Sequence, residues 1–264
     1  MRPHREAVHA QFDPQASAYL TSPVHAAGAD LAAARARLAH SASAHTQLLD
    51  VGCGAGHLSL TLAPLAARVV ALDPSPGMLE MVREAARSRA LAQIETCQAY
   101  ATGLPFAAGS FDVVASRYSA HHWLDVPRAL GEMRRVLKAG GFLLLIDLLG
   151  EEQPLLDTHL QSLELLRDPS HVRNYSASQW QALLQQCGFG SVGQQHWRTR
   201  LEFDSWVRRM RTPPALVAAI RQLQTGAPEE VQQGLQIEPD GSFSATTGLF
   251  WARAEPGVKA TGAA

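Results

Sequence analysis

Three glycines alternate directly after a short apolar run, in Leu49-Asp-Val-Gly-Cys-Gly-Ala-Gly-His57. Glycine lacks a Cβ, so this spacing lets the backbone adopt left-handed conformations and pass close to a ligand. If the loop leads from a strand into a helix, it also presents the positive end of the helix dipole to an anionic group. A glycine-rich turn without a ligand is the alternative, and three alternating glycines make it the weaker one.

The same loop argues against two common nucleotide sites. Its spacing is GxGxG, and His57 stands where the dinucleotide fingerprint GxGxxG has its last glycine. No Lys-Ser/Thr pair follows, as a Walker A loop would require. NAD-dependent oxidoreduction and nucleoside triphosphate binding are therefore disfavoured.

A carboxylate ends the next apolar run, in Ala71-Leu-Asp-Pro-Ser75. Asp73 can accept hydrogen bonds from two neighbouring hydroxyls, such as those of a ribose. An Asp before Pro is also common in turns and helix caps. Because Asp73 follows the glycine loop by one strand–helix–strand unit, we favour the ribose interpretation.

Histidines provide the candidate proton acceptors. His121 and His122 follow the fourth apolar run, and a second candidate, His171, stands in Asp168-Pro-Ser-His171. An imidazole can remove a proton from a hydroxyl or a carbon acid. We predict His122 and His171 as catalytic candidates and His121 as a substrate neighbour. The alternatives are that the pair packs or caps a helix, and that 168–171 is a polar turn.

Further residues of the second half are candidates for binding a substrate. Arg167 and Arg173 flank His171 and could hold an acidic group, while Trp206 could line an apolar cavity. Core packing is the more common role for a tryptophan. No pair of His, Asp or Glu residues has convincing metal-ligand spacing, so we predict no metal site.

Apolar runs that alternate with amphipathic segments must position these residues. We expect strands at 47–51, 68–72, 94–98, 111–115 and 142–148, and helices at 24–40, 56–65, 76–89 and 126–137. Continuous Val/Leu/Ile strands between helices are typical of a parallel sheet covered on both faces. Such a doubly wound α/β sheet binds ligands at the carboxyl ends of its strands.

The pattern loosens after Gly150. We expect helices at 154–166, 178–187 and 205–234, the last interrupted by Pro213-Pro214 and Pro228, and strands at 191–203 and 242–254. We predict that segments 151–178 and 204–237 fold over the crevice as a lid, without a core of their own. The predicted organisation is an N-terminal helical cap (1–45), a ligand-binding core (46–150), lid helices with strands completing the sheet (151–256) and a disordered tail (257–264).

Composition restricts the class of function. The 264 residues carry a net charge of −1, with no polybasic segment of the kind that neutralises phosphates, so we expect no nucleic-acid partner. Three scattered cysteines suit a reducing compartment, and no apolar N-terminal run indicates a secretory signal. The most apolar stretch, 142–149, is too short to span a bilayer. We expect a cytoplasmic protein, either a monomer or a homodimer.

Five motifs in order resemble the class I S-adenosylmethionine-dependent methyltransferases, in the small-molecule branch similar to the ubiquinone and menaquinone biosynthesis C-methyltransferases. They are the glycine loop, Leu72-Asp-Pro-Ser, Gly103-Leu-Pro-Phe, Ser110-Phe-Asp-Val-Val and Arg134-Arg-Val-Leu-Lys-Ala-Gly-Gly141. The resemblance covers about residues 46–148. It extends, through Ser116-Arg-Tyr-Ser-Ala-His-His-Trp123, 165–173 and Phe203-Asp-Ser-Trp206, to a bacterial subgroup of generic methyltransferases.

The resemblance implies a seven-stranded Rossmann-like methyltransferase fold that binds S-adenosylmethionine and releases S-adenosylhomocysteine. The loop would contact the methionyl part of the cofactor, Asp73 the ribose, Pro74 and Met78 the adenine, and Arg117 the methionyl end. Tyr19 looks like an N-terminal tyrosine that closes over that end. The implied cofactor residues are Tyr19, Asp50, Gly52, Cys53, Gly54, Gly56, Asp73, Pro74, Met78, Ala101, Thr102 and Arg117.

One departure concerns adenine recognition. The run before Leu104-Pro-Phe often holds an acidic residue in the family, but here Tyr100 and Thr102 stand in that region. The resemblance then assigns this role to the backbone near Ala101.

Two functions follow. The first is methyl transfer to a small organic acceptor at oxygen or carbon. The alternative is a protein that binds the cofactor or its product and acts through a partner without acceptor chemistry. The intact loop and Asp73 favour the first. Methylation of nucleic acid is disfavoured by the charge, and because Ser116-Arg-Tyr-Ser replaces the Asn/Asp-Pro-Pro-Tyr/Phe motif of such enzymes.

Overall fold

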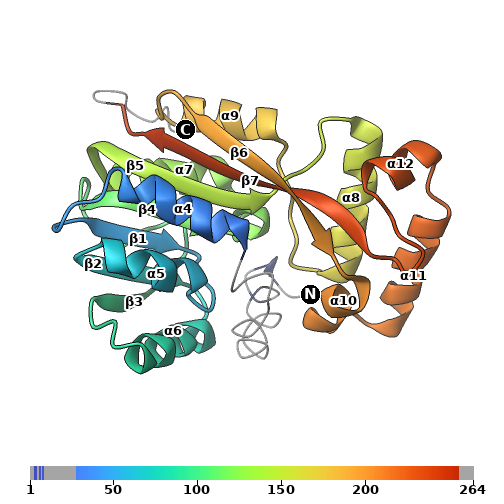
Figure 1. Ribbon diagram of the computed structural model, residues 1–264, viewed down its shortest axis with the longest axis horizontal. Helices are drawn as coiled ribbons and strands as arrows, with labels where there is room; N and C mark the ends of the chain where they lie inside the picture. The colour runs from blue at the N-terminus through green and yellow to red at the C-terminus, as the bar shows by residue number, and fades with distance from the viewer. Residues whose placement is uncertain (1–2, 5, 7, 9–27, 256–264) are drawn as a thin grey trace.

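The computed structural model describes residues 28–255 together with 3, 4, 6 and 8. Its centre is one seven-stranded sheet (Figure 1). Across the sheet the strands are β3 (Ile94–Gln98), β2 (Arg68–Asp73), β1 (Gln47–Val51), β4 (Phe111–Arg117), β5 (Leu137–Leu148), β7 (Phe243–Arg253) and β6 (Gly193–Leu201).

The first five strands are mutually parallel, whereas β7 runs antiparallel to both β5 and β6. The predicted doubly wound, mostly parallel sheet is confirmed. The chain starts in the middle at β1, moves outward to β3 and then returns to β4. The crevice at the carboxyl ends of β1 and β4 is therefore the topological switch point, where ligands bind in such sheets.

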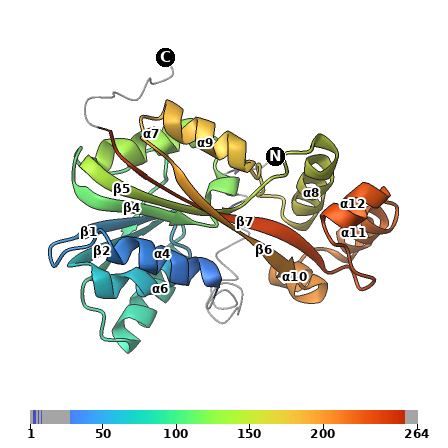
Figure 2. The same ribbon diagram turned by 45° about the horizontal axis from the view of Figure 1, so that its top comes forward.

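Helices cover both faces of the sheet (Figures 1 and 2). One face carries α4 (Ala29–Ala39), α5 (His57–Leu62) with the 3-10 turn η2 (Ala63–Leu65), and α6 (Pro76–Ser88). The other carries α7 (Val126–Val136) and α9 (Ala177–Gln186). Alternation along β1 supplies both cores, because Leu48 packs on the α4 side and Leu49 on the α7 side.

Local signals explain where several helices begin. Ser75 precedes α6 and its hydroxyl accepts a hydrogen bond from the Met78 amide at 3.1 Å. Asp125 does the same for α7, accepting from the Arg128 amide at 2.9 Å. Ser176 forms a capping box with Gln179 at the start of α9. Such caps satisfy amide groups that have no partner within the helix.

Four further helices of the region 28–255 form a compact unit beyond the edge of the main sheet (Figure 1). They are α8 (Pro154–Arg167), α10 (Phe203–Arg209), α11 (Pro214–Thr225) and α12 (Glu229–Gly234). β7 extends beyond the residues that pair with β5, so residues 243–246 pair with β6 alone. The four helices pack against this end of β7. Leu160, Trp206 and Phe243 lie in their shared apolar core.

This unit corrects the prediction that 151–178 and 204–237 form a lid without a core of their own. The apolar stripes of four short helices and the projecting strands face one another, and burying them together creates a separate core. The interruptions predicted at Pro213-Pro214 and Pro228 are confirmed, since α11 begins at Pro214 and α12 directly after Pro228.

One strand boundary also differs from the expectation. β5 begins at Leu137, five residues before the predicted 142, because Leu137 pairs with Phe111 across an irregularity in the β4–β5 ladder. Gly140, with φ +72°, allows the chain to bend there. Within the described part of the chain, no helix is long and apolar enough to cross a membrane. Tyr19, the start of the predicted helix 24–40 and the tail from 257 lie outside the described residues.

Candidate functional site

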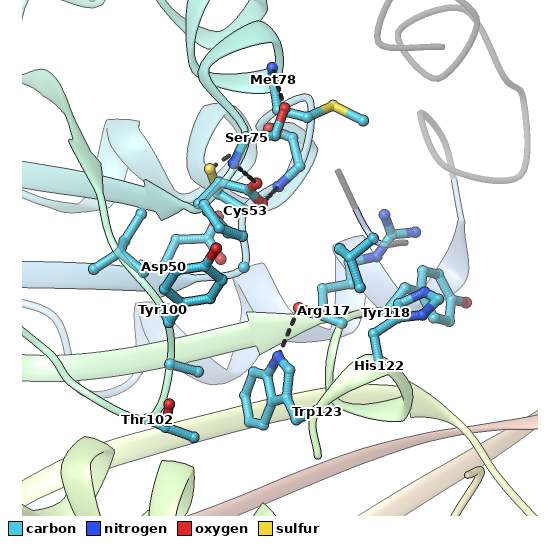
Figure 3. A pocket seen from close by; sticks show the side chains of 18 of the residues that line it. Asp50, Cys53, Ser75, Met78, Tyr100, Thr102, Arg117, Tyr118, His122 and Trp123 are labelled. Carbon is cyan, nitrogen blue, oxygen red and sulfur yellow. Dashed lines mark hydrogen bonds between the residues drawn. The ribbon is translucent and has the colours of Figure 1, made fainter. Parts of the chain in front are cut away.

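A cavity of about 270 Å³ lies at the carboxyl ends of β1, β2 and β4. Its wall includes residues of the glycine loop, the end of β2, residues 100–102 and eight residues between 117 and 128, with His4 and Val8 from the N-terminal segment. Figure 3 shows how side chains from these separate segments surround one space. The volume suits a small-molecule site.

The glycine loop has the backbone that its sequence predicts. Gly52, Gly54 and Gly56 have φ values of +69°, +51° and +85°. A Cβ on Gly52 would collide with the Ser119 hydroxyl, and one on Gly56 would lie 2.8 Å from Val82 Cγ2. A Cβ on Gly54 would meet nothing within 4 Å, and Gly54 lines the cavity. Two glycines therefore allow close packing, and Gly54 keeps the cavity open.

Asp73 connects the loop to the next helix. Its Oδ2 accepts a hydrogen bond from the Gly54 amide at 2.9 Å, and its Oδ1 accepts from the Ser75 amide at 2.9 Å. A carboxylate oxygen has two acceptor positions. Asp73 also lines the cavity, so its carboxylate borders the ligand-sized space while it holds the loop.

Asp50 is fully buried beneath the loop and also lines the cavity. Its Oδ2 accepts a hydrogen bond from the Ser59 hydroxyl at 2.6 Å, whereas its Oδ1 has no hydrogen-bond partner. Burial raises the pKa of this carboxyl to about 6. A buried carboxylate oxygen without a partner is costly, so the arrangement is suited to a ligand that brings a positive charge or a donor.

Met78, Tyr100 and Thr102 border the cavity on segments other than the one that carries His122 (Figure 3). Pro74, Met78, Ala101 and Thr102, to which the resemblance assigns cofactor contacts, all line the cavity. Tyr100 also lines it and is 36% exposed. No acidic side chain takes the place of the usual family acid in this 100–102 segment.

Arg117 ends β4 and lies almost completely buried against α4. Its Nε donates to Asp30 Oδ2, and its guanidinium lies 4.5 Å from the ring centroid of Tyr118. Both Arg117 and Tyr118 line the cavity. Tyr118 has the left-handed φ of +50°, a conformation that a bulky residue adopts only where the surrounding structure imposes it.

The three histidines predicted from the sequence do gather, but only one reaches the cavity. The ring centroids of His121 and His122 are 4.2 Å apart, and those of His121 and His171 are 5.9 Å apart. His122 lines the cavity, whereas His121 and His171 do not. Burial and the neighbouring His121 lower the pKa of His122 to about 4.

His171 faces the helical unit instead. Its Nε2 lies 3.0 Å from Gln161 Oε1 on α8, and burial with the nearby His121 and His122 lowers the pKa of His171 to about 2. His171 is therefore held neutral. In this arrangement it does not meet a ligand in the cavity.

The predicted substrate residues of the second half lie away from the cavity wall. Arg167 pairs with Glu164 and donates to the Trp206 carbonyl, and Arg173 pairs with Asp157. Trp206 is 1% exposed and packs edge-on against Phe243. None of the three lines the cavity, because internal partners and core packing satisfy each side chain.

Several lining residues were not predicted. Tyr118, Ser119 and Trp123 line the cavity, and Trp123 Nε1 donates to the Ser119 hydroxyl at 3.1 Å (Figure 3). Their position directly after β4 was the available signal, since a chain leaving the switch point must border the crevice. No group of three His, Cys, Asp or Glu side chains within the described residues could hold a metal ion.

Comparison with known proteins agrees with this geometry. Residues 49–145 match the model of a methyltransferase domain family. The chain is 48% identical over 176 residues to the uncharacterised protein YafE of Escherichia coli, covering 67% of this chain and 85% of that protein. It is 37% identical over 202 residues to the uncharacterised methyltransferase YcgJ of Bacillus subtilis, covering 76% of this chain and 79% of the relative.

The crystal structure of the same Bacillus protein superimposes with a TM-score of 0.82 and 32% identity, covering 86% of this chain and 99% of that one. A demethylmenaquinone methyltransferase of Thermus thermophilus is 38% identical over 103 residues, which is 38% of this chain and 46% of that protein. The sheet order, the glycine loop and these relatives agree. The chain therefore belongs to the class I S-adenosylmethionine-dependent methyltransferases, in the branch similar to the ubiquinone and menaquinone biosynthesis C-methyltransferases.

Proposed function

We propose that the protein binds S-adenosylmethionine in the cavity below the glycine loop and transfers its methyl group to oxygen or carbon of a small organic acceptor. The observation that carries the proposal is the pair of carboxylates at the ends of β1 and β2. Asp50 is buried with one oxygen that has no partner, and Asp73 stands beside the open side of Gly54. A cationic ligand with a ribose satisfies both.

Different residues of the cavity wall bind different parts of the cofactor in this proposal. Asp73 accepts the ribose hydroxyls, Pro74, Met78, Ala101 and Thr102 enclose the adenine, and Arg117 faces the methionyl carboxylate. Asp50 faces the positive part of the methionyl group. When bound, the cofactor would supply an electrophilic methyl group on a sulfonium, which passes to an acceptor atom aligned opposite the sulfur while S-adenosylhomocysteine leaves.

The protein's contribution to that displacement is alignment and proton removal. Holding two reactants in line contributes roughly 7–11 kcal/mol to lowering a barrier in favourable cases. His122 is the candidate base, because its imidazole lines the cavity. Its pKa, lowered to about 4 mainly by burial, leaves the ring able to accept a proton near pH 7 but makes it a weaker base. Of the two histidines predicted as bases, His171 is set aside because it does not line the cavity.

Calorimetry on the purified protein tests the cofactor. Both S-adenosylmethionine and S-adenosylhomocysteine should bind saturably at the same single site, and each should displace the other. Binding of NAD in place of either ligand would contradict the proposal.

A screen of small acceptors with methyl-labelled cofactor, followed by mass determination of the product, tests the transfer. The His122→Ala variant should then lose about 10²–10⁴-fold in turnover and keep its cofactor affinity, whereas His171→Ala should retain far more activity. If the protein binds the cofactor but methylates nothing without a second protein, the alternative of a partner-dependent binding protein holds.

A further inference from the structure

A buried polar cluster lies directly behind the wall that carries His122. It joins the turn η3 (Ala120–His122), the end of β5 and the loop that follows α8. The cluster consists of three histidines and three carboxylates, namely His121, His122, His171, Asp147, Glu164 and Asp168. Five of these side chains are not on the cavity wall, so their role toward a ligand is indirect.

Asp147 holds His121 at two points. Its Oδ1 lies 2.5 Å from His121 Nδ1, and its Oδ2 accepts from the His121 backbone amide at 3.2 Å. Asp147 is 1% exposed, and the Leu148 amide donates to its Oδ1 at 2.9 Å. The His121 carbonyl in turn accepts from the Val172 amide at 2.8 Å. The turn that carries His122 is thus fixed by one carboxylate on one side and by the loop on the other.

His122 has a defined tautomer in this setting. Its Nδ1 lies 3.1 Å from the Ser170 carbonyl oxygen, an atom that only accepts, and 3.3 Å from the Ser170 hydroxyl, which donates to Asp168 Oδ1; both contacts favour a proton on Nδ1. Nε2 is then the basic nitrogen of the ring. Asp168 Oδ2 lies 4.0 Å from Nε2 and is held by the Ser170 amide through Oδ1. A proton gained at Nε2 would therefore meet a carboxylate nearby.

The charges of the cluster are unequal. Burial opposes the protonation of His121, but the Asp147 carboxylate together with Glu164 and Asp168 outweighs burial and raises the pKa of His121. His122, whose ring is 4.2 Å from that of His121, has its pKa lowered by burial and by His121. Two buried imidazoles this close together do not both become positively charged.

We propose that Asp147 and His121 form a positioning pair that keeps His122 in its neutral, Nδ1-protonated form and fixes it on the cavity wall. The proposal rests on the proposed function for the role of His122 as a base. The pairing of Asp147 with His121 can be tested without any ligand. Asp147 and His121 touch neither cofactor nor acceptor.

Other charged and titratable groups around His122 come from each neighbouring element. His121 lies on its own turn, Asp147 on β5, and Glu164, Arg167, Asp168 and His171 on α8 and its loop. His4 of the N-terminal segment also approaches, with its Nε2 3.0 Å from the same Ser170 carbonyl. Among these groups His121 is the largest electrostatic influence that lowers the pKa of His122.

Nuclear magnetic resonance of protein labelled with ¹⁵N in histidine tests the pair without any acceptor. His122, assigned from the His122→Gln spectrum, should show a protonated Nδ1 and an unprotonated Nε2 at pH 7. His121 should titrate above a free histidine. In His121→Gln, which can still donate to Asp147, the pKa of His122 should rise by about one to two units, since a positive charge in the adjoining ring is removed.

Asp147→Asn keeps an acceptor at the same place but removes the negative charge. His121 should then be uncharged at neutral pH. The pKa of His122 should rise by less than in His121→Gln, because the Asp147 carboxylate, which favours the protonation of His122, is lost as well. His45→Gln is the matched control, since His45 is exposed, and it should leave the His122 titration unchanged. Far-ultraviolet circular dichroism confirms that each variant is folded.

A His122 that titrates at the same pH in wild type and both variants would overturn the proposal, as would a neutral His122 protonated on Nε2. Failure of the proposed function has a different signature: no S-adenosylhomocysteine binding by calorimetry, with the coupling of the two histidines still visible in the spectra. Coupling that is absent while S-adenosylhomocysteine binds normally would overturn the pair and leave the proposed function standing.

Discussion

Asp50 and Asp73 line the same cavity but differ in how their carboxylate oxygens are hydrogen-bonded. Asp73 already accepts two backbone amides that shape the loop, so it is fixed before any ligand arrives. Asp50 has one oxygen on Ser59 and the other without a partner, in a site where burial disfavours its charge. The first is suited to orient a ligand through hydroxyls, and the second gains most from a ligand that is positively charged.

Replacing Asp73 by asparagine should weaken the binding of S-adenosylhomocysteine by about 10–100-fold. The change removes a charged acceptor from the ribose hydroxyls, which costs on the order of 1.5–3 kcal/mol. Calorimetry gives the dissociation constants. Asp112→Asn is the matched control, because Asp112 accepts from Gln47 and Lys138 at the opposite end of the sheet. Equal effects from the two variants would show that the ribose is held elsewhere.

The affinity for S-adenosylmethionine should fall as the pH drops through about 6. Burial raises the pKa of Asp50 from 3.8 to about 6, so in the folded protein the carboxyl is neutral below that pH and its destabilising charge appears as the pH rises. A cationic ligand favours the charged form, so binding near pH 6 should release a proton. Calorimetry in buffers of different ionisation enthalpy measures this release, and Asp50→Asn should abolish it. A flat pH profile for the wild-type protein would contradict the role given to Asp50.

At the scale of elements, the glycines in the loop between β1 and α5 have two different roles. Gly56 is crowded by Val82 of α6, so its missing side chain serves the packing of the two helices. Gly54 has open space where a Cβ would stand, and that space belongs to the cavity. The same residue type thus contributes to stability at one position and to ligand access at another.

Gly54→Ala should reduce cofactor affinity more than Gly56→Ala, whereas Gly56→Ala should reduce stability more. Both pay for a left-handed alanine, roughly 1–2 kcal/mol, but only the Gly56 variant adds a contact of 2.8 Å with a packed side chain. Thermal unfolding and calorimetry on the two variants separate these effects. If Gly54→Ala binds S-adenosylhomocysteine as tightly as wild type, the ligand does not approach this part of the loop.

At the scale of the whole molecule, the protein has two apolar cores flanking the sheet and a third in the helical unit beyond it. The cavity lies in the sheet region, and among the described residues none of those lining it belongs to the helical unit. The loop after α8 still connects the two regions, because the Val172 and Arg173 amides donate to the His121 carbonyl at 2.8 and 3.2 Å.

Trp206→Ala should destabilise the protein by about 3–5 kcal/mol, the usual cost of removing a large buried aromatic side chain, and should leave cofactor affinity unchanged. Trp206 is 1% exposed within the third core. Urea unfolding measures the loss. Weaker binding of S-adenosylhomocysteine by a variant of unchanged stability would instead return Trp206 to the ligand-binding role first predicted for it.

Much of the fold was predictable from local patterns. The strands at 47–51 and 94–98 have the predicted bounds, and the left-handed glycines stand in the predicted loop. Apolar runs, glycine spacing and prolines act through backbone sterics and neighbouring residues, which a sequence displays directly. The position of Asp73 beside the loop also followed, since parallel strands end at one edge of the sheet.

Only the tertiary structure decided which of the candidate side chains share a cavity. His171 and Trp206 carry chemistry that suits a site, yet one bonds to Gln161 and the other fills a core. Asp147, which no motif singled out, meets His121 because β4 and β5 are neighbours in the sheet. The contact of Asp147 with His121 joins residues 26 positions apart in the chain. Such contacts depend on how whole elements pack, and the side-chain type at a single position carries no record of that packing.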